Sequence, residues 1–364
     1  MRQSQAAEYE TDTAQPARLR QAFAMQIEAC TRLGSPFTAR LLEAIEPLLD
    51  ATTATGRKIL AWRGRLDALG DSVPLRLTGA LHGMVREGRL PALAVLYPPA
   101  ALPSAEALQT VLGRVLRGED EALLGWLRFT PQTNEVARAS LLYAGLVEIT
   151  RLTGCAVGLY EVGSSAGLNL MLDRFAYDLG GRLLGEPGSR VQLRPRWDGP
   201  APAGREPRIL SRQGCDIAPL DIRNEEQRRR LSAYVWADQA ERLQRLEAAI
   251  AITLPAPPRL ERADAADWIE RRIRLSGEPG VARVVMHSIA YQYFPPETQR
   301  RIQHHLESVG AAATAQAPLA WLAFEQRGEA GPALTLRLWP GGGEAVLAEG
   351  DAHGRQLRWH GHQE

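Results

Sequence analysis

The residue pattern of this chain changes after Gly154, and that change limits the available folds more than any other feature. Before this point, apolar residues recur at spacings of three and four, which is typical of amphipathic helices. After it, short apolar runs alternate with helical segments. Alternation of strand and helix predicts a parallel sheet with helices on both faces. We therefore expect a helical part followed by a doubly wound α/β part.

Along its 364 residues the chain divides into three expected segments. Residues 1–15 are polar and predict a disordered tail. Residues 16–150 predict an all-helical N-terminal domain, and residues 151–364 a Rossmann-like α/β domain with a mostly parallel, seven-stranded sheet. Within that domain, residues 180–207 are rich in Gly, Pro and Arg and indicate an insertion, which could be a lid or a substrate platform.

The expected elements follow from periodicity and from Gly and Pro boundaries. The strands are placed in 156–162, 208–216, the start of 259–275, the start of 281–294, 319–326, 333–340 and 355–361. The helices are placed in 16–33, 37–49, 56–69, 76–100 (one or two helices), 104–118, 134–154, 168–175, 224–252 and 296–310. The final strands lack long helices between them, which indicates an antiparallel hairpin at one edge of the sheet.

Composition and charge exclude several classes of protein. The net charge is +1, which gives no overall attraction to nucleic acid. No apolar run reaches the roughly 18 residues of a membrane span, and the N-terminus lacks the apolar core of a signal peptide. The cysteines Cys30, Cys155 and Cys215 are scattered, so neither a disulfide framework nor a metal site is expected. These features predict a soluble cytoplasmic protein that acts on a small molecule and leave its oligomeric state open.

The stretch "YEVGSSAGLNL" (160–170) predicts a ligand-binding turn. It places Gly163, Ser164, Ser165 and Gly167 between a strand and a helix. In open α/β sheets ligands bind beyond the carboxyl ends of the strands, where glycine lets the backbone approach closely. The helix that follows would add N–H groups to such a site. The spacing does not fit the dinucleotide fingerprint GxGxxG.

Glu161, Gly163, Ser165 and Gly167 resemble the ExGxGxG turn of class I S-adenosylmethionine-dependent methyltransferases, with Ser165 at the central glycine. The resemblance covers residues 150–364. It implies S-adenosylmethionine as cofactor, held by this turn together with Ser164.

Further positions of the same resemblance follow in order along the chain. An acid after the second strand is expected to hold the ribose hydroxyls, and "GCDIAP" supplies Asp216. An acidic and a small residue after the third strand are expected beside the adenine, and "RADAAD" supplies Asp264 and Ala265. The long stretch between Gly167 and Asp216 departs from a simple strand–helix–strand unit.

The fourth strand of the resemblance is expected to end in polar groups near the reacting methyl. "VVMHSIAYQYF" supplies His287, Ser288 and Tyr291 as catalytic candidates and Gln292 on the substrate side. A histidine there could act as a general base near neutral pH, or could be a hydrogen-bonded histidine beneath a loop. Asn134, before the helix that leads into the first strand, is a second substrate-side candidate, although it could also simply cap that helix.

The chain as a whole is also similar to a bacterial family known as domain of unknown function 2332. The similarity lies in "PQTNEVARA" (131–139), "YEVGSSAGLNLMLDRF" (160–175), "GCDIAPLDI" (214–222), "VWADQAERLQRLEAAI" (235–250) and "HSIAYQYF" (287–294). This resemblance covers most of the chain and implies no particular reaction.

Three functions remain open from sequence. Methyl transfer needs mainly positioning and sometimes a base, which fits a chain without a metal cluster. The stretch 163–167 also satisfies GxSxG with Ser165 as the nucleophile of an α/β-hydrolase, although such an elbow is expected later in the sheet. The third alternative is a non-catalytic binding or scaffold protein that retains the methyltransferase fold.

Overall fold

The computed structural model describes residues 15–362 and shows two compact units. The first comprises the described residues up to Gln132 together with Arg229–Ala240, and the second comprises Thr133–Arg228 and the described residues from Glu241 onward. Nearly all of the expected tail, residues 1–15, lies outside the described residues; Gln15 begins the first helix. Each unit has its own core.

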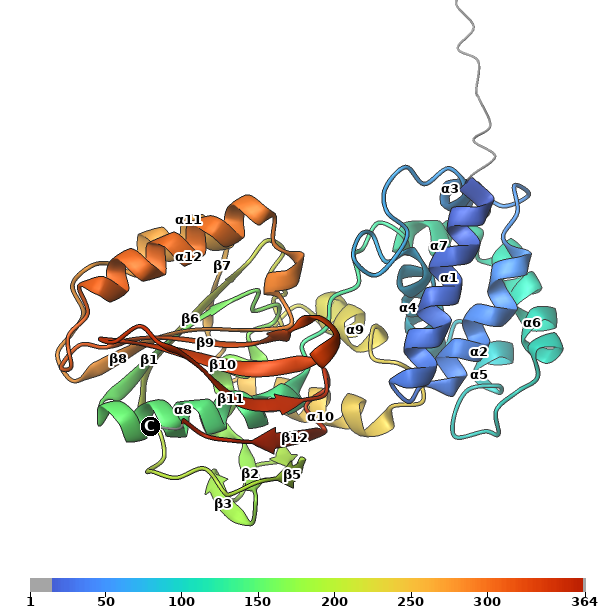
Figure 1. Cartoon of the computed structure of the whole chain (residues 1–364). Coiled ribbons are helices and arrows are strands. Elements are labelled where there is room, and N and C mark those ends of the chain that lie inside the picture. The colour runs from blue at the N-terminus through green and yellow to red at the C-terminus, as the bar shows by residue number, and fades with distance from the viewer. Residues whose placement is uncertain (1–14, 363–364) are drawn as a thin grey trace, which may run out of the picture. The chain divides into compact units, whose positions relative to one another are not determined.

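The helical unit is built from amphipathic helices, as their periodicity predicts (Figure 1). Its elements are α1 (Gln15–Arg32), α2 (Pro36–Ile45), η1 (Glu46–Leu48), α3 (Ala54–Leu60), α4 (Val73–Arg86), α5 (Pro91–Ala94), α6 (Ala105–Gly118) and α7 (Asp120–Trp126). The helix expected over 56–69 ends at Leu60. Proline at the first or second position starts α2, α4 and α5, where its missing N–H costs nothing.

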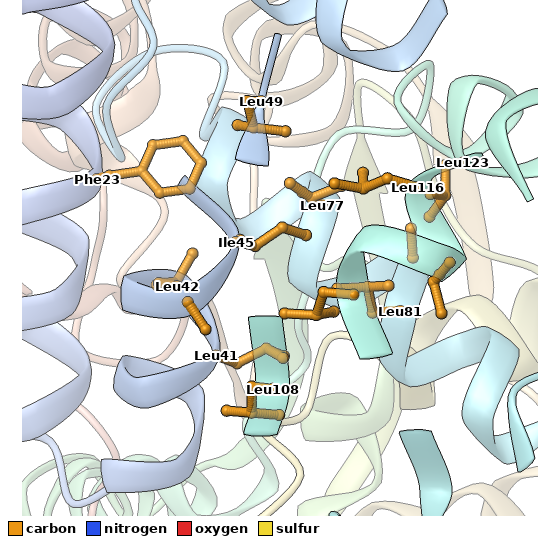
Figure 2. Close-up of a cluster of buried hydrophobic side chains, with 14 of the residues drawn as sticks. Phe23, Leu41, Leu42, Ile45, Leu49, Leu77, Leu81, Leu108, Leu116 and Leu123 are labelled. Atoms are coloured by element: carbon orange, nitrogen blue, oxygen red, sulfur yellow. The ribbon is translucent and has the colours of Figure 1, made fainter. Parts of the chain in front are cut away.

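Side chains from five of these helices meet in one apolar cluster (Figure 2). Phe23 of α1, Ile45 of α2, Leu77 of α4, Leu108 of α6 and Leu123 of α7 are all at most 1% exposed. Burial of side chains of this size stabilises a fold by about 1.5–3 kcal/mol each. The cluster gives the unit an independent hydrophobic core.

The segment Arg229–Ala240 closes the helical unit from a distant part of the sequence. Tyr234 packs on Gly79 of α4, where a Cβ atom would lie 2.4 Å from the tyrosine ring. The Asp238 carboxylate accepts the Phe37 N–H at the start of α2 (2.9 Å) and a hydrogen bond from the Ser35 hydroxyl. These contacts tie the segment to α2 and α4.

The single helix expected over 224–252 is therefore wrong. The structure has α9 (Glu225–Ala233) and α10 (Ala240–Thr253), separated by the residues that pack into the helical unit. The helical periodicity of the sequence continues through the residues between α9 and α10. These residues are not helical, because Tyr234 and Val235 are buried and Asp238 forms hydrogen bonds in the helical unit. Tertiary contacts override local propensity here.

The second unit is a nine-stranded sheet in the order β5-β12-β11-β10-β9-β8-β1-β6-β7. Five neighbouring strands are parallel, namely β7 (Arg259–Arg262), β6 (Ile209–Asp216), β1 (Ala156–Val162), β8 (Val281–Ser288) and β9 (Leu319–Gln326). The remaining strands are β10 (Pro332–Trp339), β11 (Glu344–Gly350), β12 (Gln356–Trp359) and β5 (Arg196–Asp198). The β9, β10, β11 and β12 strands form an antiparallel meander, as the helix-free end of the sequence predicts.

The parallel strands have the order of a doubly wound sheet. Numbered along the chain, they read 3-2-1-4-5 from β7 to β9, and the order reverses between β1 and β8. Helices cover both faces (Figure 1). On β9, Leu319 and Trp321 join the cluster under α11 (Ala265–Arg272) and α12 (Pro296–Ala311), whereas Leu322 contacts Gly145 of α8 (Ala139–Thr153) on the other face.

The prediction of a mostly parallel α/β sheet with helices on both faces is confirmed, but seven strands is too few. The two additional strands are β11 and β5. In β11 the only larger apolar residues are Val346 and Leu347, which lie among small and charged residues, and β5 has only three residues. Neither has a hydrophobic pattern strong enough to be recognised.

The expected insertion, residues 180–207, contains short strands rather than a plain loop. Together with the preceding segment it forms a three-stranded sheet, β3-β2-β4, and it also supplies β5 to the large sheet. The strands of the small sheet are β2 (Ala176–Leu179), β3 (Arg182–Gly185) and β4 (Gln192–Leu193). Within residues 15–362 no helix is long and apolar enough to cross a membrane.

Candidate functional site

The turn after β1 has a left-handed backbone at every second residue. The φ angle is 67° at Gly163, 53° at Ser165 and 70° at Gly167. Glycine adopts this conformation freely, whereas Ser165 is held in it against its own preference. The turn is a strained element at the carboxyl end of β1, beside the point where the strand order reverses. A ligand is expected at such a position.

The two glycines allow close packing within the protein itself. A Cβ atom on Gly163 would lie 2.6 Å from the Cβ atom of Ala290, and one on Gly167 would lie 2.9 Å from Pro258 Cγ. The sequence-based expectation was that glycine lets the backbone approach a ligand. In this structure the close neighbours are the segments after β8 and before β7.

Asp216, at the end of β6, fixes the turn to the neighbouring strand. One of its carboxylate oxygens accepts the N–H of Ser165 (2.9 Å) and the other accepts the N–H of Ala218 (2.8 Å). Ser164 adds hydrogen bonds from its N–H (3.0 Å) and hydroxyl (3.1 Å) to the Cys215 carbonyl. The sequence-predicted neighbours Ser164, Ser165 and Asp216 are thus brought together.

Glu161 lies in β1, two residues before the turn, and only 2% of it is exposed. Its Oε2 atom has no hydrogen-bond partner among the described residues. Burial, and then the nearby negative charge of Asp216, raise the pKa of the Glu161 carboxyl well above its usual value. The hydroxyl of Ser165 and the Oδ1 atom of Asn169 are likewise buried without partners. Three polar groups around the turn therefore have unused hydrogen-bonding capacity.

Asp264 and Ala265 lie where β7 leads into α11, and both have structural contacts. The Asp264 carboxylate caps the helix by accepting the N–H groups of Ala266 (2.8 Å) and Asp267 (3.2 Å). Its second oxygen accepts the Thr298 hydroxyl (3.0 Å). Ala265 is buried in the first turn of α11.

Asn134 connects the segment before α8 to the turn. Its side-chain oxygen accepts the N–H of Leu168 (2.9 Å), the first residue of the 3₁₀ helix η3 (Leu168–Arg174). Four residues on, in η2 (Val136–Arg138), the Arg138 guanidinium donates to the Ser288 carbonyl at the end of β8 (3.1 Å). The segment thus reaches both strands that flank the reversal point, and Asn134 positions η3.

Glu135 forms a buried ion pair with Arg242 of α10. The Oε2–Nε distance is 2.5 Å, and the side chains are 4% and 12% exposed. Burial pushes the pKa of Glu135 upward, but the positive charges of Arg242 and Arg138 outweigh it and lower that pKa. Burial, followed by the charge of Arg242, lowers the pKa of nearby His353 to about 4. The ion pair is therefore charged at neutral pH beside a neutral histidine.

His287 is 1% exposed and uses both ring nitrogens in hydrogen bonds. The indole N–H of Trp321 can only donate, so Nε2 of His287 accepts it (2.8 Å) and Nδ1 carries the hydrogen toward Glu325 Oε1 (2.8 Å). The ring also stacks on Tyr291, with centroids 5.0 Å apart. No lone pair of this imidazole is left to take a proton from a substrate in this arrangement.

Glu325 organises the segment that follows β8. Its Oε1 atom also accepts the N–H groups of Ala290 (2.9 Å) and Tyr291 (3.1 Å). Burial opposes ionisation of this carboxyl, but the His287 hydrogen bond and these N–H groups lower its pKa. These hydrogen bonds stabilise a backbone conformation in which Ile289 has a φ of 48°, which is an outlier for a β-branched residue.

The other sequence candidates near β8 differ in exposure. The Tyr291 hydroxyl donates to the Gln299 carbonyl (2.8 Å), and burial, followed by the charge of Glu325, raises its pKa to about 12. The Ser288 carbonyl accepts Arg138, as described above. Gln292 is exposed. Tyr291 thus packs against His287, and Gln292 is the solvent-facing member of the group.

A cavity of about 360 Å³ adjoins the turn at Ala166. Its other walls are the segments 219–223, after β6, and 257–260, before and within β7. Three prolines and three leucine or isoleucine side chains make the walls largely apolar. The charged residues of the lining are Asp221, Arg223 and Arg259. It is within the size range of small-molecule sites. Glu161, Asp216 and Asp264 do not line it.

Comparison with known proteins gives one result. The profile of a bacterial family described as an uncharacterised protein conserved in bacteria (DUF2332) matches residues 20–359. The chain belongs to this family. The sequence-based prediction of the family is confirmed. No curated protein and no solved structure matches the chain.

The five stretches that resemble this family are joined by the contacts described above. The stretch 131–139 contacts three of the others. Asn134 links it to 160–175, Glu135 links it to 235–250, and Arg138 links it to 287–294. Ser165 links 160–175 to 214–222 through Asp216. They therefore form one network around the carboxyl ends of β1, β6 and β8.

Residues around the site that were not predicted as site residues include Glu325, Arg242 and Asn169. The contacts of Glu325 and Arg242 join residues 38 and 107 positions apart. A sequence indication existed for Glu325, because it is an acid near the end of an apolar strand. Arg242 lies among several arginines on helices, and nothing in the pattern distinguishes it. Among residues 15–362, no group of three or more His, Cys, Asp or Glu side chains could hold a metal.

The structure also bears on the hydrolase alternative. The Ser165 hydroxyl has no hydrogen-bond partner among the described residues, so no histidine activates it. We expect a fluorophosphonate probe to leave Ser165 unlabelled, and Ser165→Ala to leave any esterase activity unchanged. Intact-mass spectrometry of the treated protein checks this, with Ser164→Ala as the matched control. Labelling of Ser165 would instead establish a nucleophile.

Proposed function

We propose that this protein binds S-adenosylmethionine at the turn after β1 and transfers its methyl group to a small or medium-sized acceptor. One observation carries the proposal. Glu161, Asp216 and Asp264 lie within two residues of the carboxyl ends of three adjacent parallel strands, and the first of these strands lies at the reversal of strand order. That arrangement is the expected location of a nucleotide-like ligand.

The residues around the turn offer the chemistry that such a ligand needs. Buried Glu161, Ser165 and Asn169 have unpartnered oxygens that can accept hydrogen bonds from amino or hydroxyl groups. Asp216 could accept hydrogen bonds from ribose hydroxyls, in addition to those that it already accepts from two N–H groups. The apolar cavity beside Ala166 could receive a flat ring.

When bound, the cofactor supplies an activated methyl group on a sulfonium, so the protein mainly provides position. Glu161 and Asp216 would hold the ligand, and Asn134 would hold η3 behind the turn. The proposal assigns no proton transfer to His287, because Trp321 and Glu325 occupy both of its nitrogens. We assign His287 to fixing the segment 288–294 at the edge of the site.

Calorimetry with S-adenosylmethionine, S-adenosylhomocysteine and NAD tests the proposal. We expect the first two to bind and NAD not to bind. Asp216→Asn removes a charged hydrogen-bond acceptor and should weaken binding about tenfold or more. Asp178→Asn is the matched control, because Asp178 also accepts a turn N–H but lies in the small sheet. Binding of NAD alone would move the protein to the dehydrogenases.

The non-catalytic alternative has one observation in its favour, which is the complete engagement of His287. A scaffold that retains the fold would bind none of the three ligands. Cofactor binding by the wild type, weakened by Asp216→Asn but unaffected by Asp178→Asn, would contradict a scaffold without a cofactor site.

A further inference from the structure

We propose that Glu161 is a proton-linked cation receptor: it is neutral in the empty site and ionises when a positively charged group of the ligand binds. This inference deepens the proposed function and rests on it. S-adenosylmethionine carries both a sulfonium and an ammonium group, so it is a ligand of the required class. Ligand binding would then release one proton.

The geometry around Glu161 lacks a compensating cation. Its neighbours in register are Gly214 on β6 and Met286 on β8, and neither titrates. Asp216, further along β6, adds a like charge. A carboxylate buried in such surroundings is costly, and the neutral acid is favoured.

Two basic groups on the surrounding elements are already engaged. Arg212, earlier on β6, pairs with Asp173 of η3 (2.6 Å). Arg138, just before α8, donates to the Ser288 and Ala352 carbonyls. Neither guanidinium pairs with Glu161, whose Oε2 atom has no hydrogen-bond partner within residues 15–362. A ligand cation would therefore be the first ionic partner of this carboxyl.

Proton balance gives the expected behaviour. The O–H bond of the Glu161 carboxyl breaks, the proton passes to the buffer, and the carboxylate pairs with the ligand cation. Because the protonated form must first ionise, affinity should rise with pH, by up to about tenfold per pH unit while Glu161 is protonated in the free protein. A neutral ligand would gain nothing from this step.

Calorimetry of the full chain in buffers with different ionisation enthalpies measures the proton release. At a pH where Glu161 is protonated in the ligand-free protein, we expect S-adenosylmethionine to release up to one proton. The neutral probe 5′-methylthioadenosine should release none. Glu161→Gln should abolish both the release and the pH dependence of the affinity. Glu261→Gln is the matched control, because Glu261 already pairs with Arg272, and it should keep both.

The outcomes separate the two proposals. Binding of S-adenosylmethionine without proton release, or with release that persists in Glu161→Gln, overturns the receptor role and leaves the proposed function standing. Absence of binding at every pH overturns both. Release of about one proton that depends on Glu161 and on the ligand's charge supports both.

Discussion

Replacing Glu135 by alanine should destabilise the protein by about 3–5 kcal/mol, the usual cost of leaving one member of a buried ion pair without its partner. The Arg242 guanidinium would lose this carboxylate and would remain nearly as buried as it is now, with its side chain only 12% exposed. The N–H of Ala137, which Glu135 caps, would also lose its acceptor. Urea denaturation followed by circular dichroism measures the loss.

Two comparisons make this result specific. Glu297→Ala removes one partner of an exposed pair with Arg300 and should change stability by at most about 0.5 kcal/mol. The double change Glu135→Leu with Arg242→Met should recover much of the loss, because neither charge then stays buried alone. A loss below about 1 kcal/mol for Glu135→Ala would show that Arg242 finds another partner.

The acid dependence has a defined sign. The native pKa of Glu135 is lowered, so its contribution to stability is present above its unfolded pKa of about 4.3 and is lost as pH falls through the native value. The difference between wild type and Glu135→Ala should therefore shrink in acid.

Replacing Glu161 by glutamine should have the opposite effect and stabilise the empty protein at neutral pH. The native pKa of Glu161 is raised, so above about pH 4.3 the unfolded chain gives up this proton while the native protein keeps it. Stability then falls with rising pH, by up to about 1.4 kcal/mol per unit. Glutamine removes this dependence because it does not titrate.

The stability gained in Glu161→Gln should grow by roughly 1–2 kcal/mol between about pH 5 and about pH 7. Parallel urea titrations across this range measure it. Glu349→Gln, at an exposed position of β11, provides the control and should show no such growth. A constant difference between Glu161→Gln and wild type would mean that the native carboxyl titrates as in the unfolded chain. A gain in stability at a site residue is the expected mark of a group retained for binding.

Local pattern was sufficient to predict β1 and its turn. The run 156–162 is apolar and bounded by glycines, and the structure has β1 over Ala156–Val162. The adjacency of Asp216 to the turn was also predictable, because parallel strands end at the same edge and β6 neighbours β1. Such features depend on residues close in sequence or on one simple rule of topology.

The chemistry of individual side chains was less predictable. His287 could be placed at the end of a strand, but its hydrogen bonds to Trp321 and Glu325 depend on residues 34 and 38 positions away. The same holds for Arg242, whose partner Glu135 is 107 positions earlier. These contacts are set by strand and helix packing, which a local pattern does not contain.

The segment Arg229–Ala240 has a consequence for the order in which the chain can fold during synthesis. The helical unit needs Asp238 to cap α2 and Tyr234 to fill the surface over Gly79. A ribosome that has released only the first 132 residues has therefore not yet supplied everything that this unit requires. By the time Ala240 emerges, β1 and β6 have already been made. The N-terminal unit should reach its final stability only after part of its neighbour has been synthesised, so the two units cannot be completed strictly one after the other.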